Sequence, residues 1–422
     1  MDPEAYLDSL EPIGWKLGLE RMRTLSTLLG LPQHRFASIH VVGTNGKSSV
    51  TRMIAALLEA HGVSAGACVS PHTTRWSERV LVHGGEIDAA GFATAVERAA
   101  VAAETVNRTL EEGEAVTQFE LATAAAFLAL ANARVEAAAV EAGLGGRLDA
   151  TNTIPSKVTV LTSVGLDHTE WLGETEEQIA AEKLAVLRDQ TTLVLGRVGP
   201  PVAALARRAA EERGAGLIVA PEDPGAEIAL HVRGRFQRRN FALARTAAEA
   251  FLGDLDPGRV AEVAAAIEIP GRLERVADDP PTLLDAAHNP DGAKALAEAL
   301  PEVAAGRPVV AVLAILADKD ARAMIQALSP ALSQAICTEL PRADGPNSVD
   351  MRPLSARRRA VGARELARMC IEAGLAAQAE EDFGAAVARG RELAREIGGV
   401  LLVTGSHYAL GPARAALGLG AG

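Results

Sequence analysis

The chain has 422 residues, 48% of them hydrophobic and only 3% aromatic, which is enough for two or three domains with aliphatic cores. Its formal net charge of −12 excludes a general nucleic-acid binder, which normally presents a basic face, and no apolar run is long enough to cross a bilayer. The three cysteines are far apart in the sequence, which predicts free thiols in a reducing cytoplasm. The N-terminus is acidic and no apolar stretch follows it, so we expect no signal peptide.

Apolar runs alternate with helical patterns along most of the chain, which is typical of a parallel sheet covered by helices. Helical periodicity covers 50–60 and 237–252. A first series of strand-like runs lies at 38–42, 66–69, 137–140, 158–161, 193–195 and 217–219, and a second at 282–284, 309–316, 335–337 and 400–403. The pattern predicts the α/β class.

Two breaks separate the two series of strands. The segments 269–272 and 278–281 are rich in Pro, Gly and Asp and interrupt both periodicities. We therefore expect an ATP-binding P-loop domain over 1–273, followed by a smaller Rossmann-like α/β domain over 274–422.

A glycine-rich loop, Gly43-Thr44-Asn45-Gly46-Lys47-Ser48-Ser49, follows the first strand-like run and precedes a helix. Its glycines let the backbone approach a ligand, the first helical amides favour an anion, and Lys47 adds a fixed charge. Ser48 or Ser49 can offer a hydroxyl to Mg²⁺. The usual P-loop spacing is only partly met, because Val41 stands where a glycine is normal. An ordinary tight turn is the alternative, but the strand-loop-helix context favours the phosphates of ATP.

Other polar residues follow neighbouring strand-like runs. Ser70, Glu141 and His168 each come directly or shortly after such a run, and Glu141 is followed by a Gly-Leu-Gly-Gly turn. Parallel sheets bind ligands at the carboxyl ends of their strands, so we expect these residues to converge near the loop. Each alone is as consistent with a structural role. Together they can hold Mg²⁺, for which oxygen ligands are preferred and one imidazole is feasible.

Lys183 lies inside an apolar helical stripe. Thr175 and Gln178 form a capping-box pattern at the start of that helix, and Lys183 falls four residues after Ile179. One interpretation is a lysine whose ammonium reaches the surface. The other is a buried lysine that is modified or paired near the metal, since a bare buried ammonium is costly.

The second series also carries polar residues at strand ends. Asp285 to Pro290, Ala317 to Asp320 and Thr404 to Ser406 each follow a strand-like run. We expect Arg272 and Asp285 to reach a nucleotide held by the first domain.

These motifs, taken in order, resemble the folylpolyglutamate synthase/dihydrofolate synthase family of the Mur ligase superfamily. The run from Glu141 to Asn152 is the most specific of them, and the likeness spans nearly the whole chain. It rests on Gly43 to Lys47, Ser70-Pro71-His72, Glu141 to Asn152, Asp167-His168-Thr169, Pro270-Gly271-Arg272, Asp285 to Pro290, Ala317 to Asp320 and Val403 to Ser406.

The resemblance implies an amide-forming ligase in the cytoplasm. It would transfer the γ-phosphate of ATP to a carboxylate of dihydropteroate or a folate, and L-glutamate would attack the acyl phosphate. We expect a monomer that uses Mg²⁺. The resemblance implies ATP contacts at Thr44, Asn45, Gly46, Lys47, Ser48, Ser49, Asn240, Arg272 and Asp285; metal ligands at Ser70, Glu141, His168 and a carbamylated Lys183; a pterin-side pocket at Lys16, Leu17, Gly18, Phe119, Leu148, Asp149 and Ala150; and catalytic support from Lys47, Lys183, Arg272, His288 and Ser406.

Two departures from the family pattern occur: Ser48 stands where the family usually has glycine, and Ala286 replaces the glycine of Asp-Gly-Ala-His-Asn-Pro. A cell-wall Mur ligase is one alternative, but its additional N-terminal domain has no room before residue 43. A regulatory P-loop NTPase is the other, although it needs no second α/β domain. Whether dihydropteroate, folates or both are used stays open.

Overall fold

The computed structural model describes residues 2–10, 18–341 and 360–419, and its contacts divide the chain into two compact units. The first unit runs to His231 and resumes over Arg238–Ile267, while the second holds Val232–Gln237 and the residues from Glu268 onward. The domain boundary after residue 273 stays a prediction, and it did not anticipate that Val232–Gln237 packs with the second unit.

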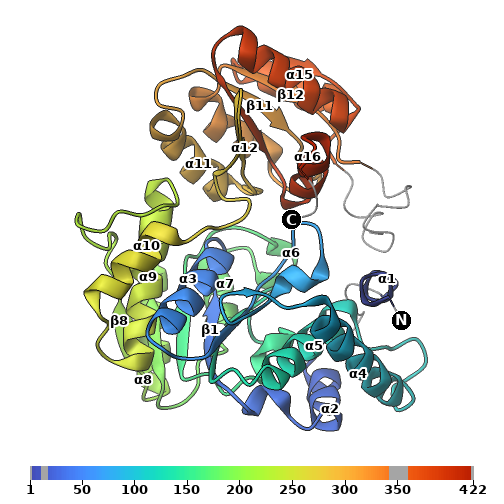
Figure 1. The fold of residues 1–422 in the computed structure, drawn as a ribbon, viewed down its shortest axis with the longest axis vertical. Helices are drawn as coiled ribbons and strands as arrows, with labels where there is room; N and C mark the ends of the chain where they lie inside the picture. Colours follow the sequence, from blue (N-terminus) through green and yellow to red (C-terminus); the bar gives the residue numbers. More distant parts are fainter. Residues whose placement is uncertain (1, 11–17, 342–359, 420–422) are drawn as a thin grey trace. The chain divides into compact units, whose positions relative to one another are not determined.

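The first unit is built on an eight-stranded sheet with β1 near its middle (Figure 1). Six neighbouring strands of that sheet, β2, β5, β1, β6, β7 and β8, are parallel. Strands β3 and β4, at one edge, pair antiparallel. In spatial order they are β4 (Gly85–Glu86), β3 (Val80–Val82), β2 (Ala65–Cys68), β5 (Ala137–Glu141), β1 (Ala37–Val42), β6 (Val158–Leu161), β7 (Thr192–Leu195) and β8 (Gly216–Val219).

Helices cover this sheet, and its central strands are therefore buried along almost their whole length. One face carries α4 and α5, which pack on each other and on α2 (Figure 1). Helix α3, predicted over 50–60, lies against β1, β2 and β5 through an apolar stripe of Val50, Met53, Ile54, Leu57 and Leu58, all fully buried, and α10 packs on it. The helices are α1 (Pro3–Asp8), α2 (Glu20–Leu28), α3 (Lys47–Ala60), α4 (Ala89–Asn107), α5 (Gln118–Asn132), α6 (Thr169–Leu172), α7 (Glu176–Leu184), α8 (Pro200–Glu212), α9 (Arg235–Leu252) and α10 (Pro257–Ala266).

The second unit is a six-stranded sheet between two helical layers. Successive side chains of β11 point to opposite faces of the sheet. Val309, Ala311 and Leu313 pack under α11, α12 and α14, whereas Val310 and Val312 pack under α15 and α16. In spatial order the strands are β13 (Ala377–Ala379), β12 (Gln334–Cys337), β11 (Val309–Leu313), β14 (Val400–Thr404), β10 (Pro281–Leu284) and β9 (Glu274–Asp278), and the helices are α11 (Pro290–Val303), α12 (Ala321–Leu328), α14 (Ala363–Glu372), α15 (Phe383–Glu396) and α16 (Leu410–Ala416).

The α/β class and all ten predicted strands are confirmed, with small shifts at their ends. The strand expected over 309–316 ends at Leu313, where regular pairing stops. The next three residues of the apolar run stay buried, which is why the run predicted a longer strand. The segment expected to break periodicity at 278–281 is the turn of an antiparallel hairpin between β9 and β10. Cys68, Cys337 and Cys370 are free and buried, and none of the helices that the structure describes is long and apolar enough to cross a membrane.

Candidate functional site

The glycine-rich loop joins the carboxyl end of β1 to the first turn of α3. Gly43 has φ +151°, and a Cβ there would lie 1.8 Å from Oγ1 of Thr162. Gly46 is the N-cap of α3 with φ +85°, and a Cβ there would lie 2.7 Å from Oδ1 of Asn240 on α9. Only glycine fits either position, because both the backbone angle and the space exclude a side chain. The loop is therefore pressed between the end of β6 and α9.

Two residues that follow β6 hold this loop in place. The amide of Thr44 donates to the carbonyl of Ser163 (2.8 Å), and the amide of Asn45 donates to Oγ of Ser163 (3.0 Å). Oγ1 of Thr162 donates to the carbonyl of Asn45 (2.7 Å). The next amides, at the start of α3, have no acceptor within the helix, and with the helix dipole they form a site for an anion.

Glu141 and Ser70 meet the loop at Ser48, as the sheet topology predicted. Oγ of Ser48 donates to Oε1 of Glu141 (2.9 Å) and lies 3.3 Å from the carbonyl of Ser70. The amide of Ser70 donates to Oε2 of Glu141 (2.9 Å), and the Glu141 side chain is 2% exposed. A carboxylate, a hydroxyl and a carbonyl thus lie together at the ends of β1, β2 and β5, which is a donor set for a hard cation.

The structure separates the two serines of the loop. Ser49 is buried, and its Oγ has no hydrogen-bond partner among the described residues. We expect Ser48→Ala to lower the rate of ATP-dependent turnover about tenfold or more, because the hydroxyl beside Glu141 is lost. Ser49→Ala should leave the rate within about twofold, since it removes a hydroxyl that makes no hydrogen bond to any described residue. Initial rates of ADP release at saturating ATP check this, and a larger loss in Ser49→Ala would reverse the assignment.

Lys183 is buried at the last turn of α7, so the alternative in which it reaches the surface is wrong. Its Nζ donates to the carbonyl of Gly43 (2.9 Å), and the side chain is 4% exposed. The capping box of Thr175 and Gln178 at the start of α7 is confirmed. Burial, and after it the nearby Lys47, lower the pKa of Lys183 to about 7. A large share of this amine is therefore neutral near pH 7.

Lys47 begins α3, and its Nζ donates to the carbonyl of Thr44 (3.2 Å). The chain thus brings two lysine nitrogens to one loop, each on a backbone carbonyl of that loop. The Lys47 ammonium supplies positive charge where phosphate groups would lie.

The Gly-Leu-Gly-Gly turn after Glu141 serves packing. A Cβ on Gly143 would lie 2.4 Å from the ring of Phe119, and one on Gly146 would lie within 3.0 Å of backbone atoms of Glu182 and Lys183. The turn therefore allows α7 to approach closely enough to place Lys183 under the loop. Leu148 is exposed, whereas Asp149 and Ala150 are buried.

Asp149 braces this turn through a buried chain of hydrogen bonds. It accepts from the amides of Leu144 (2.8 Å) and Thr151 (3.0 Å) and from the Thr151 hydroxyl. Because that hydroxyl is already donating, Nε2 of His40 is the donor to Oγ1 of Thr151, at 2.9 Å. Burial raises the pKa of Asp149, although the hydrogen bonds from Thr151 and Leu144 act in the opposite direction. His40 is thereby held as the neutral tautomer protonated on Nε2.

His40 should make the protein sensitive to acid. Burial, with Arg188 as the next cause, lowers the pKa of His40 from 6.5 to about 3. Between these values the unfolded chain binds one proton more than the native chain, so stability falls as pH drops through this window, by about 1.4 kcal/mol per pH unit for one proton. We expect urea unfolding at a series of pH values to show a shallower slope for His40→Gln, which keeps a donor near the Nε2 position. An unchanged slope would show that His40 does not titrate on unfolding.

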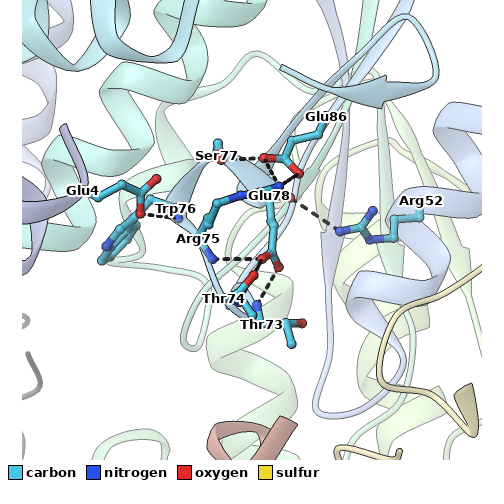
Figure 2. A network of polar contacts seen from close by, with 9 residues as sticks. All are labelled: Glu4, Arg52, Thr73, Thr74, Arg75, Trp76, Ser77, Glu78 and Glu86. Atoms are coloured by element: carbon cyan, nitrogen blue, oxygen red, sulfur yellow. Dashed lines mark hydrogen bonds and ion pairs between the residues drawn. The ribbon is translucent and has the colours of Figure 1, made fainter. Parts of the chain in front are cut away.

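The segment after Ser70 is fixed by Glu78 (Figure 2). Its carboxylate accepts from the amides of Thr73 (2.7 Å), Thr74 (2.8 Å) and Arg75 (2.8 Å), and from the Thr74 hydroxyl. Burial alone would raise the pKa of Glu78, but these hydrogen bonds lower it below its usual value. Glu4 reaches this segment from α1 and accepts from the amide of Trp76 (2.9 Å). The chain leaving Ser70 is therefore a braced loop.

His168 follows β6 in an exposed position with φ +51°. Its Nε2 lies 3.7 Å from Oδ1 of Asp167. Within residues 2–10, 18–341 and 360–419, no three His, Cys, Asp or Glu side chains gather to form a metal site. A role of His168 as a metal ligand stays a prediction.

In the second unit, Asp285 braces its own strand end. Its carboxylate accepts from the amides of Leu273 (2.9 Å) and Ala287 (2.9 Å), and burial raises its pKa, while Arg272 has the largest opposing effect. Nδ1 of His288 lies 2.9 Å from the carbonyl of Ala286. Ser406 is buried and caps the turn at Tyr408. The contacts of these residues with a nucleotide or glutamate stay predictions.

Two predicted pocket residues, Lys16 and Leu17, lie outside the described residues, and Gly18 is the first residue after them. Sequence reasoning missed Thr162 and Ser163, which hold the phosphate loop. The signal was present, because they directly follow a strand-like run, as Ser70 and Glu141 do.

Comparisons with known proteins agree with this arrangement. Residues 41–226 match the Mur ligase middle domain, and residues 271–407 match the Mur ligase glutamate ligase domain. The dihydrofolate synthase/folylpolyglutamate synthase of Mycobacterium tuberculosis is 35% identical over 360 residues, which cover 76% of this chain and 74% of that protein. The chain belongs to the folylpolyglutamate synthase/dihydrofolate synthase family of Mur ligases.

Solved structures of this family share the whole fold. The M. tuberculosis folylpolyglutamate synthase complexed with ADP and AMPPCP has a TM-score of 0.87 and 31% identity, covering 98% of this chain and 97% of that one. A bifunctional folylpolyglutamate synthase/dihydrofolate synthase from Yersinia pestis, complexed with AMPPNP and a Mn ion, has a TM-score of 0.81 and 28% identity, with 98% and 97% covered. The family's two-unit α/β architecture is therefore that of this chain.

Proposed function

We propose that this chain is an ATP-dependent ligase that joins L-glutamate to dihydropteroate, to folates, or to both, through an acyl phosphate. The observation that carries this is the loop Gly43 to Ser49, on which Lys47, Lys183 and the Glu141–Ser48 pair converge. Relatives with this activity in their names, and related structures with ATP analogues, support the proposal.

The first step transfers the γ-phosphate of ATP to the substrate carboxylate, which breaks the bond to ADP and forms a mixed anhydride. The amides at the start of α3 and the Lys47 ammonium would bind the phosphate oxygens and spread the charge that develops during transfer. The glutamate amine then attacks the carbonyl carbon, gives up a proton, and phosphate leaves. No nucleophile from the protein is needed.

The donor set fits a hard divalent cation, which we propose to be Mg²⁺. Glu141 and Ser48 would hold it, with Ser70 and His168 as further predicted ligands. When bound, such an ion supplies charge neutralisation for the transferred phosphate. Glu141, already oriented by the Ser70 amide, needs no rearrangement to present its carboxylate.

We further propose that Lys183 is carbamylated. The neutral fraction of this buried amine can add to carbon dioxide with loss of one proton, which places a carboxylate beside the loop and removes the cost of a buried ammonium. The burial of Lys183 supports this.

The substrate-side and second-unit roles complete the proposal. Phe119 and Leu148 would contact the pterin, with Asp149 and Ala150 supporting the pocket. Asn240 on α9, beside Gly46, would lie near the adenine side of ATP. Arg272, Asp285 and His288 would assist at the nucleotide and glutamate, and we expect a monomer.

A product assay tests the function. Purified protein receives ATP, Mg²⁺, L-glutamate and either dihydropteroate or tetrahydrofolate, and ADP release and product mass are measured side by side. We expect ADP release only when an acceptor and glutamate are both present, with a product heavier by one glutamyl residue. Lys47→Met serves as the inactive control. Release of ADP that does not depend on acceptor and glutamate would favour a regulatory NTPase, and no release with either acceptor would contradict the proposal.

A further inference from the structure

A polar pocket lies at the amino ends of the strands of the first unit's sheet, at the opposite end from the phosphate loop. It has a volume of about 590 Å³ and is lined by residues that precede β1, β6 and β7, with α2 and Arg188 completing it. The phosphate loop follows the carboxyl end of β1, so this pocket at the amino ends of the strands is separate from the nucleotide site.

The charge of the pocket is one-sided. Arg23, His34, Lys157 and Arg188 all line it, and no aspartate or glutamate does so within the described residues. This contrasts with the chain as a whole, which has 54 acidic and 42 basic residues. Arg23 pairs with Glu20 at 2.6 Å, but both side chains are more than half exposed, and such surface pairs contribute little.

Arg188 has no carboxylate partner among the described residues although it is half-buried. Its Nη2 donates to the carbonyl of Asn152 (2.7 Å), to Oδ1 of Asn152 (2.8 Å) and to the carbonyl of Ile154 (3.1 Å). These neutral acceptors fix the guanidinium plane without neutralising it, and Arg188 forms no ion pair in the part of the chain that the structure describes. Nε of Arg188 also donates to the carbonyl of Ile154 (3.3 Å), so among the described residues Nη1 is left to donate to a carboxylate or phosphate.

The neighbouring charges increase this imbalance. Burial is the largest cause that lowers the pKa of Arg188, and the guanidinium groups of Arg213 and Arg23 follow, with only Asp189 acting in the opposite direction. Arg23 and Arg188 therefore repel each other at one end of the sheet. Asp189 is already paired with Arg213 at 3.0 Å and does not line the pocket.

A buried hydroxyl lies at the same place. Oγ of Ser156, a lining residue that is 2% exposed, has no hydrogen-bond partner among the described residues. A guanidinium fixed by neutral acceptors, two further basic side chains, no carboxylate in the lining and a hydroxyl able to donate together favour an anionic ligand.

We propose that this pocket binds a small polyanion that carries at least two carboxylate or phosphate groups. Arg188 is the fixed central contact, and Arg23 and Lys157 reach the outer groups of the ligand from two sides. The site is distinct from the nucleotide loop, and its occupancy need not require turnover.

Isothermal titration of the full chain, with ADP present to occupy the phosphate loop, tests this. The probes are a γ-linked triglutamate peptide, for carboxylates, and inorganic tripolyphosphate, for phosphates. We expect one of them, or both, to bind at one site per chain. Triglutamate alone would identify a polycarboxylate site, and tripolyphosphate alone a phosphate site.

Variants with exposed side chains test the location without endangering the fold. The double variant Arg23→Gln, Lys157→Gln should weaken binding about tenfold or more, whereas Lys157→Arg should preserve it. Arg35→Gln is the matched control, because Arg35 is an exposed arginine that also lies just before β1 but does not line the pocket. Failure of both probes to bind, or equal binding by the double variant and Arg35→Gln, would overturn the proposal.

Discussion

Replacing Lys183 by alanine is expected to lower the rate of glutamate addition by about 10²–10³-fold while the chain stays folded. The substitution removes the nitrogen that donates to the Gly43 carbonyl and, under our proposal, the carboxylate that the carbamate supplies. It also leaves space beside the phosphate loop. Bicarbonate or a short carboxylate such as acetate should enter that space and restore part of the activity, measured as ADP release over a range of acetate concentrations.

Two further variants make this result interpretable. Lys183→Met fills the space and should be inactive without rescue, which separates loss of the carboxylate from loss of packing. Lys294→Ala removes an exposed lysine of α11 and should change nothing. Full activity of Lys183→Met would show that the amine is dispensable, and absence of rescue under every condition would count against carbamylation.

The second large effect is expected from Gly43→Ala. A methyl group there would lie 1.8 Å from Oγ1 of Thr162 and 3.2 Å from the amide of Ser163, in a backbone conformation that alanine rarely adopts. The loop must shift away from β6, which breaks the hydrogen bonds of Thr44 and Asn45. We expect about 3 kcal/mol of lost stability by urea unfolding and loss of nearly all ATP turnover.

Gly62→Ala provides the matched control for backbone strain. Gly62 lies just after α3 with φ +83°, but no atom lies within 4 Å of the position a Cβ would take. Its replacement should cost about 1 kcal/mol, from strain alone, and leave turnover unchanged. Equal effects of the two substitutions would mean that the contact with Thr162 is unimportant.

Much of the fold could be predicted from sequence because its central strands are buried on both faces and appear as continuous apolar runs. The edges could not. Strands β3 and β4 have three and two residues, and both residues of β4 are exposed, so neither strand carries a clear pattern. Strand β9 lies between the two predicted breaks and was not predicted, since its residues are only partly buried or exposed.

The site was predictable where one rule applied. Ser70 and Glu141 were placed by their position at strand ends, and the structure joins them through a hydrogen bond. Which nitrogen of His40 carries the proton could not be predicted from the sequence. It depends on the hydrogen bonds of Thr151 and Asp149, and Thr151 lies 111 residues from His40 along the chain. The choice between Ser48 and Ser49 was beyond reach for the same reason: it depends on the rotation of α3 relative to β5.

The close packing of Gly146 on the backbone of α7 divides the Glu141 to Asn152 run into parts with different tolerance to engineering. A side chain at Gly143 or Gly146 would displace Phe119 or Lys183, and Asp149 holds the turn from inside. Leu148 is exposed and Arg147 makes only a partly exposed ion pair with Glu182. Under our proposal that Leu148 contacts the pterin, a library that seeks altered acceptor specificity would vary residues 147 and 148. It would leave the glycines unchanged, because substitutions there would destroy the enzyme before any change in specificity could be measured.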